Sequence, residues 1–258
     1  MATTVLFHEL TRAEARDATE ALLIIPTGAV EQHGPHLAVG LDSAVVEHIA
    51  REAAARAAKH IPVFVTPTVS FGSSEHHLPF GGTMSLKTDT YYRVLCELIE
   101  SLIAGGFRRF FLLNGHGGNH EVVQLVARDL ALRYPVNAAA GSYWVMAWDA
   151  LIEAGAHTVE RFPMHAGAFG TSIALALHPE YVHPPLPHRD KVPQADPRSF
   201  YRPYRAEIHG FWEDIDGFGG SPDRASAEHG RRYLAAVIAA VGDAFVEFHR
   251  IPLAPAPD

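Results

Sequence analysis

Short apolar runs alternate along the chain with longer amphipathic stretches. Four runs have the length and composition of buried strands: 21–26, 62–68, 107–113 and 136–142. Four stretches carry apolar positions at helical spacing: 43–58, 87–104, 120–132 and 224–249. The alternation of such strands and helices predicts an α/β fold, with a mostly parallel, doubly wound sheet and helices on both of its faces.

A long segment, residues 178–222, follows neither pattern. It is rich in Pro, Gly, Tyr and His, and its prolines break any regular element. We expect an irregular excursion that packs on the body of the protein or on a neighbouring subunit. Its aromatic part, YRPYRAEIHGFWEDIDGF, favours a homo-oligomer because a monomer would cover these side chains poorly. With 48% apolar residues in a chain of 258, residues 1–258 are predicted to form one domain.

Composition and charge argue against several classes of function. The formal net charge of -8 is spread along the chain without a block of Lys or Arg, so we expect a small substrate and no nucleic-acid partner. No stretch approaches the roughly 20 apolar residues of a membrane span, and the first residues do not resemble a secretion signal. The single cysteine, Cys96, lies in an apolar helical pattern, which predicts a core position and fits a reducing compartment. We therefore expect a cytoplasmic protein.

Candidate chemistry gathers where three predicted strands end. Ligand sites of open α/β sheets lie beyond the carboxyl ends of the strands. The loops 28–43, 70–86 and 114–120, together with a later loop, concentrate imidazoles and carboxylates: Glu31, His33, His36, Asp42, Glu75, His76, His77, His116 and His165. Such a mixture of ligands suits zinc, manganese or iron(II), whereas calcium and magnesium prefer oxygen ligands alone.

Individual residues of this set also have ordinary structural explanations. Glu31 and His33 are alternate residues of one extended loop, so both can face one ion or two adjacent ions. Asp42 could bridge two metals with its two oxygens, but it could instead cap the helix predicted from residue 43. The turn NGHGGN, residues 114–119, could bind an anion at a helix start. We favour the interpretation that its glycines let the backbone turn while His116 is aimed inward.

Four motifs carry a resemblance to a known family. PTGAVEQHGPHLAVGLD, GSSEHHLPFGGTMSL, NGHGGN and HAGAFGTS occur in an order and spacing similar to those of the creatininase (creatinine amidohydrolase) family, over about residues 20–180. The resemblance implies a three-layer α/β/α subunit with two divalent metal ions, which would be zinc, manganese or iron. It also implies hydrolysis of a non-peptide or cyclic amide C–N bond, and a homo-oligomer, often a hexamer.

The same resemblance suggests roles for individual residues. The family's metal ligands are matched by Glu31, His33, Asp42 and His116, with Asp42 as the bridge. His165 matches a histidine at the family's catalytic centre. Glu75 could contact the substrate or orient a ligand, and it could also be a surface carboxylate. The residues expected to contact the substrate are Trp144, as an aromatic wall, Ser74 and His76.

The chain departs from the family pattern where relatives usually carry a carboxylate. Gly118 and Gly170 stand at positions where a glutamate is common, and Ala168 also lacks a carboxylate found in many relatives. The second ion would therefore be one ligand short. Glu121 could substitute, although an acid at the start of a helix is also favourable for the helix itself. Water or substrate could complete the shell, or the protein could hold a single ion.

We therefore expect a metal-dependent amidohydrolase acting on a small-molecule amide, such as a creatinine-like compound, a lactam or a formamide. Metal-activated water would attack the carbonyl carbon, and His165 would protonate the leaving nitrogen, because an imidazole titrates near neutral pH. On this interpretation, His165→Ala cuts turnover and spares metal content. The alternative is a metal-binding scaffold or regulatory protein that has kept the fold and lost the reaction.

Overall fold

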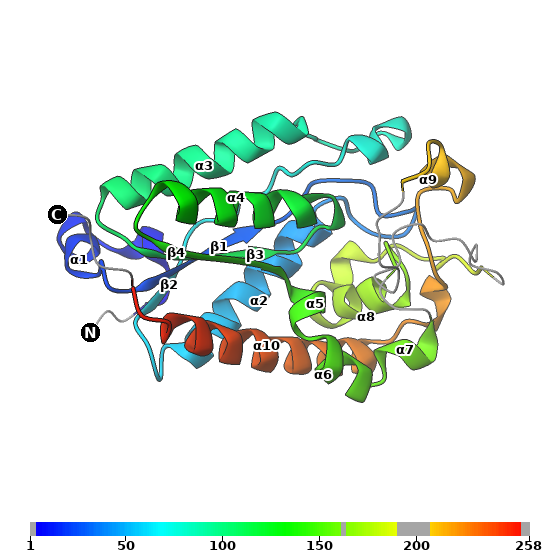
Figure 1. The fold of residues 1–258 in the computed structure, drawn as a ribbon. Helices are drawn as coiled ribbons and strands as arrows, with labels where there is room; N and C mark the ends of the chain where they lie inside the picture. Colours follow the sequence, from blue (N-terminus) through cyan, green and yellow to red (C-terminus); the bar gives the residue numbers. More distant parts are fainter. Residues whose placement is uncertain (1–3, 161–163, 190–206, 254–258) are drawn as a thin grey trace.

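Four parallel strands of the described residues form the central sheet (Figure 1). The computed structural model describes residues 4–160, 164–189 and 207–253. The strands are β1 (Leu22–Thr27), β2 (Val63–Val65), β3 (Arg109–Asn114) and β4 (Asn137–Ser142), in the order β2-β1-β3-β4. β1 and β3 pair over their whole length, so Thr27 and Asn114 are neighbours at the carboxyl edge. This register brings the loops after β1 and β3 to the same edge of the sheet.

Helices cover both faces of this sheet (Figure 1). One face carries α3 (Thr88–Ala104) and α4 (His120–Arg133), and the other carries α2 (Leu41–Ala57), α8 (Ala168–Leu177) and α10 (Ala227–His249). Leu22 and Ile24 of β1 belong to the core beneath α2 and α10, whereas Leu23 and Ile25 belong to the core beneath α3 and α4. Burial of each such side chain stabilises the fold by about 1.5–3 kcal/mol. The predicted three-layer α/β/α arrangement is confirmed.

The predicted elements differ from the observed ones mainly at their ends, and α8, a helix of 10 residues, was not predicted. The helix predicted from residue 43 begins at Leu41, and the last helix, predicted from residue 224, begins at Ala227. The strand predicted at 62–68 is reduced to Val63–Val65. Its prolines at positions 62 and 67 lack the N–H group that a regular ladder needs.

Several short helices have too few residues for the hydrophobic pattern to reveal them. The short α-helices are α1 (Arg12–Asp17), α5 (Tyr143–Met146), α6 (Trp148–Glu153), α7 (Ala156–Val159) and α9 (Phe211–Asp214). The 3-10 turns are η1 (Phe7–Glu9), η2 (Glu75–Phe80), η3 (Gly117–Asn119), η4 (Pro179–Tyr181) and η5 (Pro222–Arg224). Four of these, η2, η3, η4 and α9, lie in the segments that carry the predicted chemistry or the irregular excursion, and η5 begins at the last residue of the excursion.

The described parts of the excursion at 178–222 pack on the body of the protein. Ala38 N–H donates to the Tyr181 carbonyl, and His183 N–H donates to the His36 carbonyl. Gly219 N–H donates to the His165 carbonyl at 2.8 Å, so the end of the excursion is attached next to a predicted site residue. These hydrogen bonds join the described parts of the excursion to the body of the protein, while residues 190–206 lie outside the described residues.

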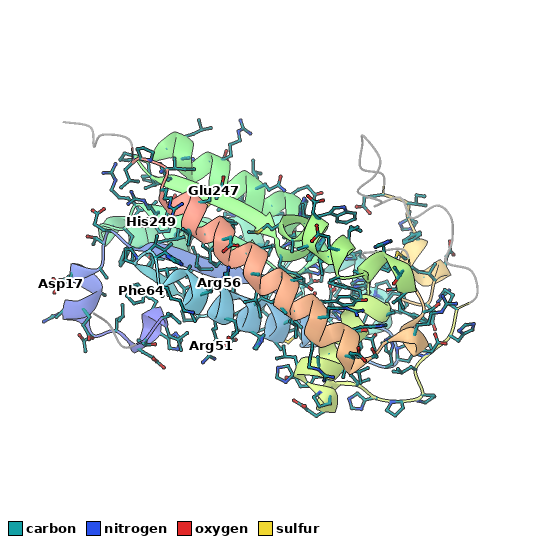
Figure 2. The ribbon with its side chains drawn as sticks, turned by 90° about the horizontal axis from the view of Figure 1, so that it is seen from below. Asp17, Arg51, Arg56, Phe64, Glu247 and His249 are labelled. Atoms are coloured by element: carbon teal, nitrogen blue, oxygen red, sulfur yellow. The ribbon has the colours of Figure 1, made fainter. Side chains whose placement is uncertain are left out.

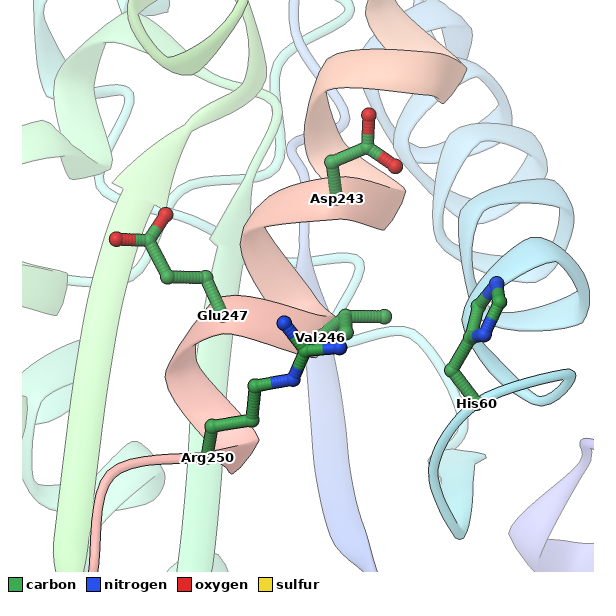
Figure 3. A pocket seen from close by; sticks show the side chains of 5 residues that line it. All are labelled: His60, Asp243, Val246, Glu247 and Arg250. Carbon is green, nitrogen blue, oxygen red and sulfur yellow. The ribbon is translucent and has the colours of Figure 1, made fainter.

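α10 runs across the lower face of the molecule toward the amino ends of the strands (Figure 2). Arg56 of α2 pairs with Asp243 of α10 at 3.0 Å, and His249 contacts the Glu20 carbonyl just before β1. A hollow of about 270 Å³ lies beside this end of α10 and is lined by His60, Asp243, Val246, Glu247 and Arg250 (Figure 3). It is therefore at the edge of the sheet opposite to the predicted chemistry.

Two simpler expectations concern Cys96 and membrane spans. Cys96 is a free, buried cysteine in the core beneath α3 and α4, as predicted, and burial raises the pKa of its thiol. In the described ranges, no helix combines the length and the apolar character that crossing a membrane requires.

Candidate metal centre

The Glu31 carboxylate lies in the middle of the cluster at the carboxyl edge of the sheet. Its side chain is fully buried, and its Oε1 atom lies 3.1 Å from His116 Nδ1, 3.6 Å from His165 Nδ1 and 3.8 Å from His77 Nε2. Among the described residues, neither oxygen has a hydrogen-bond partner of acceptable geometry. A buried carboxylate without such partners is costly, and a bound cation would offset that cost. The surroundings of Glu31 therefore fit a metal ligand.

Asp42 faces two different histidines with its two oxygens. Its Oδ1 atom lies 3.1 Å from His33 Nε2, and its Oδ2 atom lies 3.1 Å from His116 Nδ1. Asp42 belongs to the first turn of α2, where Gly40 is the N-cap and makes no side-chain cap. The carboxylate is thus directed at the imidazoles, and the alternative role as a helix cap is not what the structure shows.

Protons stabilise this arrangement when no metal is bound. Burial lowers the pKa of His33, but Asp42 and then Glu31 outweigh burial and raise that pKa to about 9. Burial also lowers the pKa of His116, but Glu31 and Asp42 outweigh burial and raise that pKa to about 10. Burial alone would raise the pKa of Asp42, but His33 and His116 hold it below its ordinary value. Metal binding would have to displace these protons.

Main-chain carbonyls orient the two imidazoles that face Asp42. His33 Nδ1 donates to the Glu31 carbonyl oxygen at 3.1 Å, which leaves Nε2 for Asp42. His116 Nε2 donates to the Ser73 carbonyl oxygen at 3.1 Å, which leaves Nδ1 for Asp42 and Glu31. Metal-bound histidines usually donate their second N–H in this way. The hydroxyl of Ser74, predicted to contact substrate, also lies 3.1 Å from His116 Nε2.

Three groups of potential ligands share Glu31. Within each group, the ligand atoms lie within 4.8 Å of one another. The groups are Glu31 with Asp42 and His116, Glu31 with His33 and His165, and Glu31 with His76 and His77. The structure therefore brings together all four residues predicted as metal ligands, and adds three further histidines beside them.

Other predicted residues lie outside this cluster. Glu75 is exposed at the start of η2, and the next two residues, His76 and His77, are the ones that join the cluster. His36 is buried, but its Nε2 contacts the Thr171 hydroxyl, and burial lowers its pKa to about 4. Glu121 is exposed in the first turn of α4 and belongs to none of the ligand groups found among the described residues.

The ring of Trp212 lies against three histidines of the cluster. Its ring centroid lies 4.6 Å from that of His77, 5.2 Å from that of His165 and 5.8 Å from that of His76. Trp144, predicted as the aromatic wall, instead packs edge-on against Tyr143 in the hydrophobic core. Trp212 belongs to α9 in the excursion. The sequence indicates that the aromatic side chains of this segment pack against something, but it does not indicate which residues they contact.

Gly118 lies where the loop of η3 meets the loop of η2. A Cβ atom at this position would overlap the Ser73 carbonyl oxygen and the His116 ring. Asn119 ties the loops together, because its side chain accepts from Ser73 N–H and donates to the Gly28 carbonyl. A carboxylate at position 118 is therefore sterically excluded. The NGHGGN turn acts here as a close-packed support for His116, which favours that interpretation over an anion site.

Comparison with known proteins identifies the family of the chain. A family model described as creatininase, creatinine amidohydrolase, matches residues 8–245. The chain belongs to the creatininase family. The model spans all three loops of the cluster and His165, so family membership covers the whole candidate centre.

Relatives within the creatininase family carry different names. The chain is 30% identical to a mycofactocin precursor peptide peptidase of Mycobacterium tuberculosis, over 86% of this chain and 83% of the relative. It is 30% identical to a creatinine amidohydrolase of Pseudomonas putida, over 96% of this chain and 98% of the relative. It is also 29% identical to a 3-dehydro-scyllo-inosose hydrolase of Thermotoga maritima, over 70% and 58%.

Solved creatininases share the fold. One creatininase structure aligns with a TM-score of 0.77 and 25% identity, covering 97% of this chain and all of the other. Another, described as the Mn form, aligns with a TM-score of 0.71 and 26% identity, over 95% of this chain and 98% of the other. A third, a mutant described as Zn-Zn type, aligns with a TM-score of 0.70 and 26% identity over the same shares.

Proposed function

We propose that this creatininase-family chain is a metal-dependent hydrolase that cleaves a C–N bond of a small amide. The observation that carries this proposal is the fully buried Glu31 carboxylate, without hydrogen-bond partners among the described residues and surrounded by imidazole nitrogens. The relatives named above are hydrolases or a peptidase by name, and solved creatininases are described with manganese or zinc.

The residues that would hold the metal ions are Glu31, His33, Asp42 and His116. Asp42 would bridge two ions, because each of its oxygens faces a different histidine. A divalent ion held by these residues would supply an acidified water and a positive charge to polarise a carbonyl group. The Asn119 side chain ties together the loops that carry these residues, which would hold the ligands in place before the substrate binds.

The substrate would lie against the Trp212 side of the cluster. Trp212 presents its ring to His76, His77 and His165, and a planar amide could stack in the same layer. We keep Ser74, His76 and Trp144 as proposed substrate contacts, and Glu75 as a proposed catalytic residue. Of these, His76 is the one in direct ring contact with Trp212.

A proton must reach the leaving nitrogen, because an amide anion is a very poor leaving group at neutral pH. Two imidazoles beside Glu31 could supply it, His165 and His77. Both lie close to the Glu31 carboxylate, but their ring nitrogens have different hydrogen-bond partners.

The bond that is cleaved separates two versions of this proposal. The creatinine amidohydrolase relative, aligned over nearly its whole length, favours a small or cyclic amide. The peptidase relative, at the same 30% identity, favours a peptide bond as the second candidate. Neither version changes the ligands that the chain contributes.

A substrate panel with metal reconstitution tests the proposal. The purified chain would be stripped of metal, reloaded with zinc or manganese, and incubated with creatinine, a lactam, a formamide and short peptides. We expect release of amine from at least one of these substrates, dependent on metal and lost in Asp42→Asn. A protein that keeps its metal and remains inert on every substrate would instead be the scaffold considered as the alternative.

A further inference from the structure

The two ring nitrogens of His165 have different partners. Nε2 lies 3.0 Å from the main-chain carbonyl oxygen of Gln32, and Nδ1 lies 3.6 Å from Glu31 Oε1. A carbonyl oxygen only accepts hydrogen bonds, so Nε2 must carry the proton. The neutral ring therefore presents a lone pair, not a proton, from Nδ1 toward the carboxylate.

The side chain of Gln32 does not reverse this assignment. Its Nε2 also lies 3.4 Å from His165 Nε2, but both of its hydrogens have shorter partners, at 2.6 Å on the Gly217 carbonyl and 2.8 Å on His77 Nδ1. Its Oε1 accepts from Gly34 N–H at 2.8 Å. These contacts fix which end of the amide is nitrogen, and they leave His165 Nε2 to donate to the Gln32 carbonyl.

His165 thus follows the same rule as His33 and His116. Each of the three rings donates one N–H to a main-chain carbonyl oxygen, and each turns its other nitrogen toward Glu31 or Asp42. The rings of His33 and His165 lie 4.4 Å apart, and their ligand atoms form one group with Glu31. An outer carbonyl partner of this kind is the usual setting of a metal-bound imidazole.

His77 lies at a similar distance from Glu31 and has the opposite arrangement. Its Nδ1 accepts from the Gln32 amide, so the proton of the neutral ring is on Nε2, which faces Glu31 Oε1 at 3.8 Å. His77 therefore presents an N–H group to the centre, where His165 presents a lone pair.

From this contrast, we propose that His165 is a metal ligand through Nδ1, next to His33. It would supply the donor that a family carboxylate supplies at the positions of Gly118 and Gly170. The close packing around Gly118 agrees with this exchange, because a side chain at that position has no room. This inference rests on the proposed metal centre and reverses the expectation that His165 protonates the leaving nitrogen. His77 then offers a hydrogen bond from Nε2–H to the substrate, and the proton for the leaving nitrogen comes from the attacking water.

Metal binding by matched variants tests the inference. The full chain and the variants His165→Ala, His165→Asp and His77→Ala would be stripped with a chelator and titrated with zinc against a chromophoric competitor, with bound zinc counted by mass spectrometry. We expect His165→Ala to lose the more weakly bound zinc ion, or to bind that ion more than roughly 100-fold more weakly. Loss of a hydrogen-bond partner of a ligand, as opposed to a ligand itself, weakens metal binding by at most roughly 100-fold. His165→Asp, which restores a ligand, and His77→Ala should both retain that ion.

A measurement on the unmodified chain avoids dependence on variant folding. In cadmium-loaded protein with nitrogen-labelled histidine, Nδ1 of His165 should show scalar coupling to the metal, and His77 should not. Unchanged zinc binding by His165→Ala, equal loss in His77→Ala, or absence of the His165 coupling would overturn the inference. A wild-type chain that binds no zinc would instead overturn the proposed function.

Discussion

At the scale of single residues, the candidate centre is a set of side chains whose charges compensate one another. In the metal-free protein, the carboxylates of Glu31 and Asp42 raise the pKa values of His33 and His116 to about 9 and about 10. The ordinary value is 6.5. The protonated imidazoles in turn hold the pKa of Asp42 down. A metal ion would take over the role of these protons, so metal and protons compete for the same site.

This competition predicts the pH dependence of stability without metal. At His33 and His116 the folded chain binds more protons than the unfolded chain between pH 6.5 and about 9–10, so their contribution to the free energy of unfolding is fully present below pH 6.5 and should be lost through that window. Thermal melting in the presence of a chelator measures this. Asp42→Asn removes the shared carboxylate and should flatten the dependence. A wild-type melting temperature that stays constant from pH 6.5 to 10 would contradict the prediction.

The two tryptophans next to the loops should behave differently when truncated. Trp212 contacts the histidines and belongs to neither hydrophobic core of the described residues. Trp212→Ala should therefore raise KM by about 2- to 10-fold, because the substrate would lose a stacking contact. Trp144 is part of the core, so Trp144→Ala should lower the free energy of unfolding by about 3–5 kcal/mol. Steady-state kinetics and denaturant unfolding distinguish them. A KM effect confined to Trp144 would restore it as the aromatic wall.

At the scale of elements, the centre depends on how tightly the loops pack against one another. Asn114 at the end of β3 bonds with Thr27 of β1 and with the main chain of His116, and Asn119 links the loops of η2 and η3. Glu160 accepts from Phe169 N–H at the start of α8 and from Ser221 N–H in the excursion. The ligands are thus carried by short segments that bond to one another through side-chain amides and carboxylates.

Two neighbouring glycines provide a matched test of this packing. Gly118→Ala would push the Ser73 carbonyl and the His116 ring apart, with a destabilisation of about 1–3 kcal/mol and weaker zinc binding. At Gly117, an added Cβ meets no atom within 4 Å, so Gly117→Ala should leave both properties nearly unchanged. Unfolding curves and zinc titration measure the pair. Equal behaviour of the two variants would show that the loop is less tightly packed than the structure indicates.

At the scale of the whole molecule, the excursion at 178–222 contacts the candidate centre directly. Its α9 brings Trp212 to the histidines, and its Gly217 carbonyl accepts from Gln32, whose own carbonyl holds His165. The hollow beside the end of α10 lies at the far edge of the sheet and shares no residue with this network. Substrate contacts are therefore expected on the side of α9.

The assembly state is a separate prediction for the whole molecule. We expect a homo-oligomer, because the sequence places many aromatic residues in an irregular segment and the family resemblance points the same way. Light scattering coupled to size exclusion should give a molar mass that is a multiple of 28.1 kDa. A mass equal to one chain at micromolar concentration would contradict the expectation.

The sequence by itself determined the order of strands and helices and the chemical nature of the candidate centre. Both follow from local features: apolar spacing over a few residues reports the elements, and imidazoles and carboxylates just after strands must lie near the carboxyl edge of a parallel sheet. For this reason a wider set of imidazoles and carboxylates, and the ability of Asp42 to bridge two ions, could be named before any coordinates. The family resemblance then singled out Glu31, His33, Asp42 and His116 as the expected ligands.

Only the tertiary structure decided which neighbours surround those residues. Trp212 rather than Trp144 contacts the histidines, and the Gln32 carbonyl, 133 positions from His165, sets the tautomer of that ring. No local pattern encodes such contacts, because they depend on where the excursion and the loops come to rest against each other. The orientation of an imidazole is set by its hydrogen-bond partners, and in this protein those partners come from distant parts of the chain.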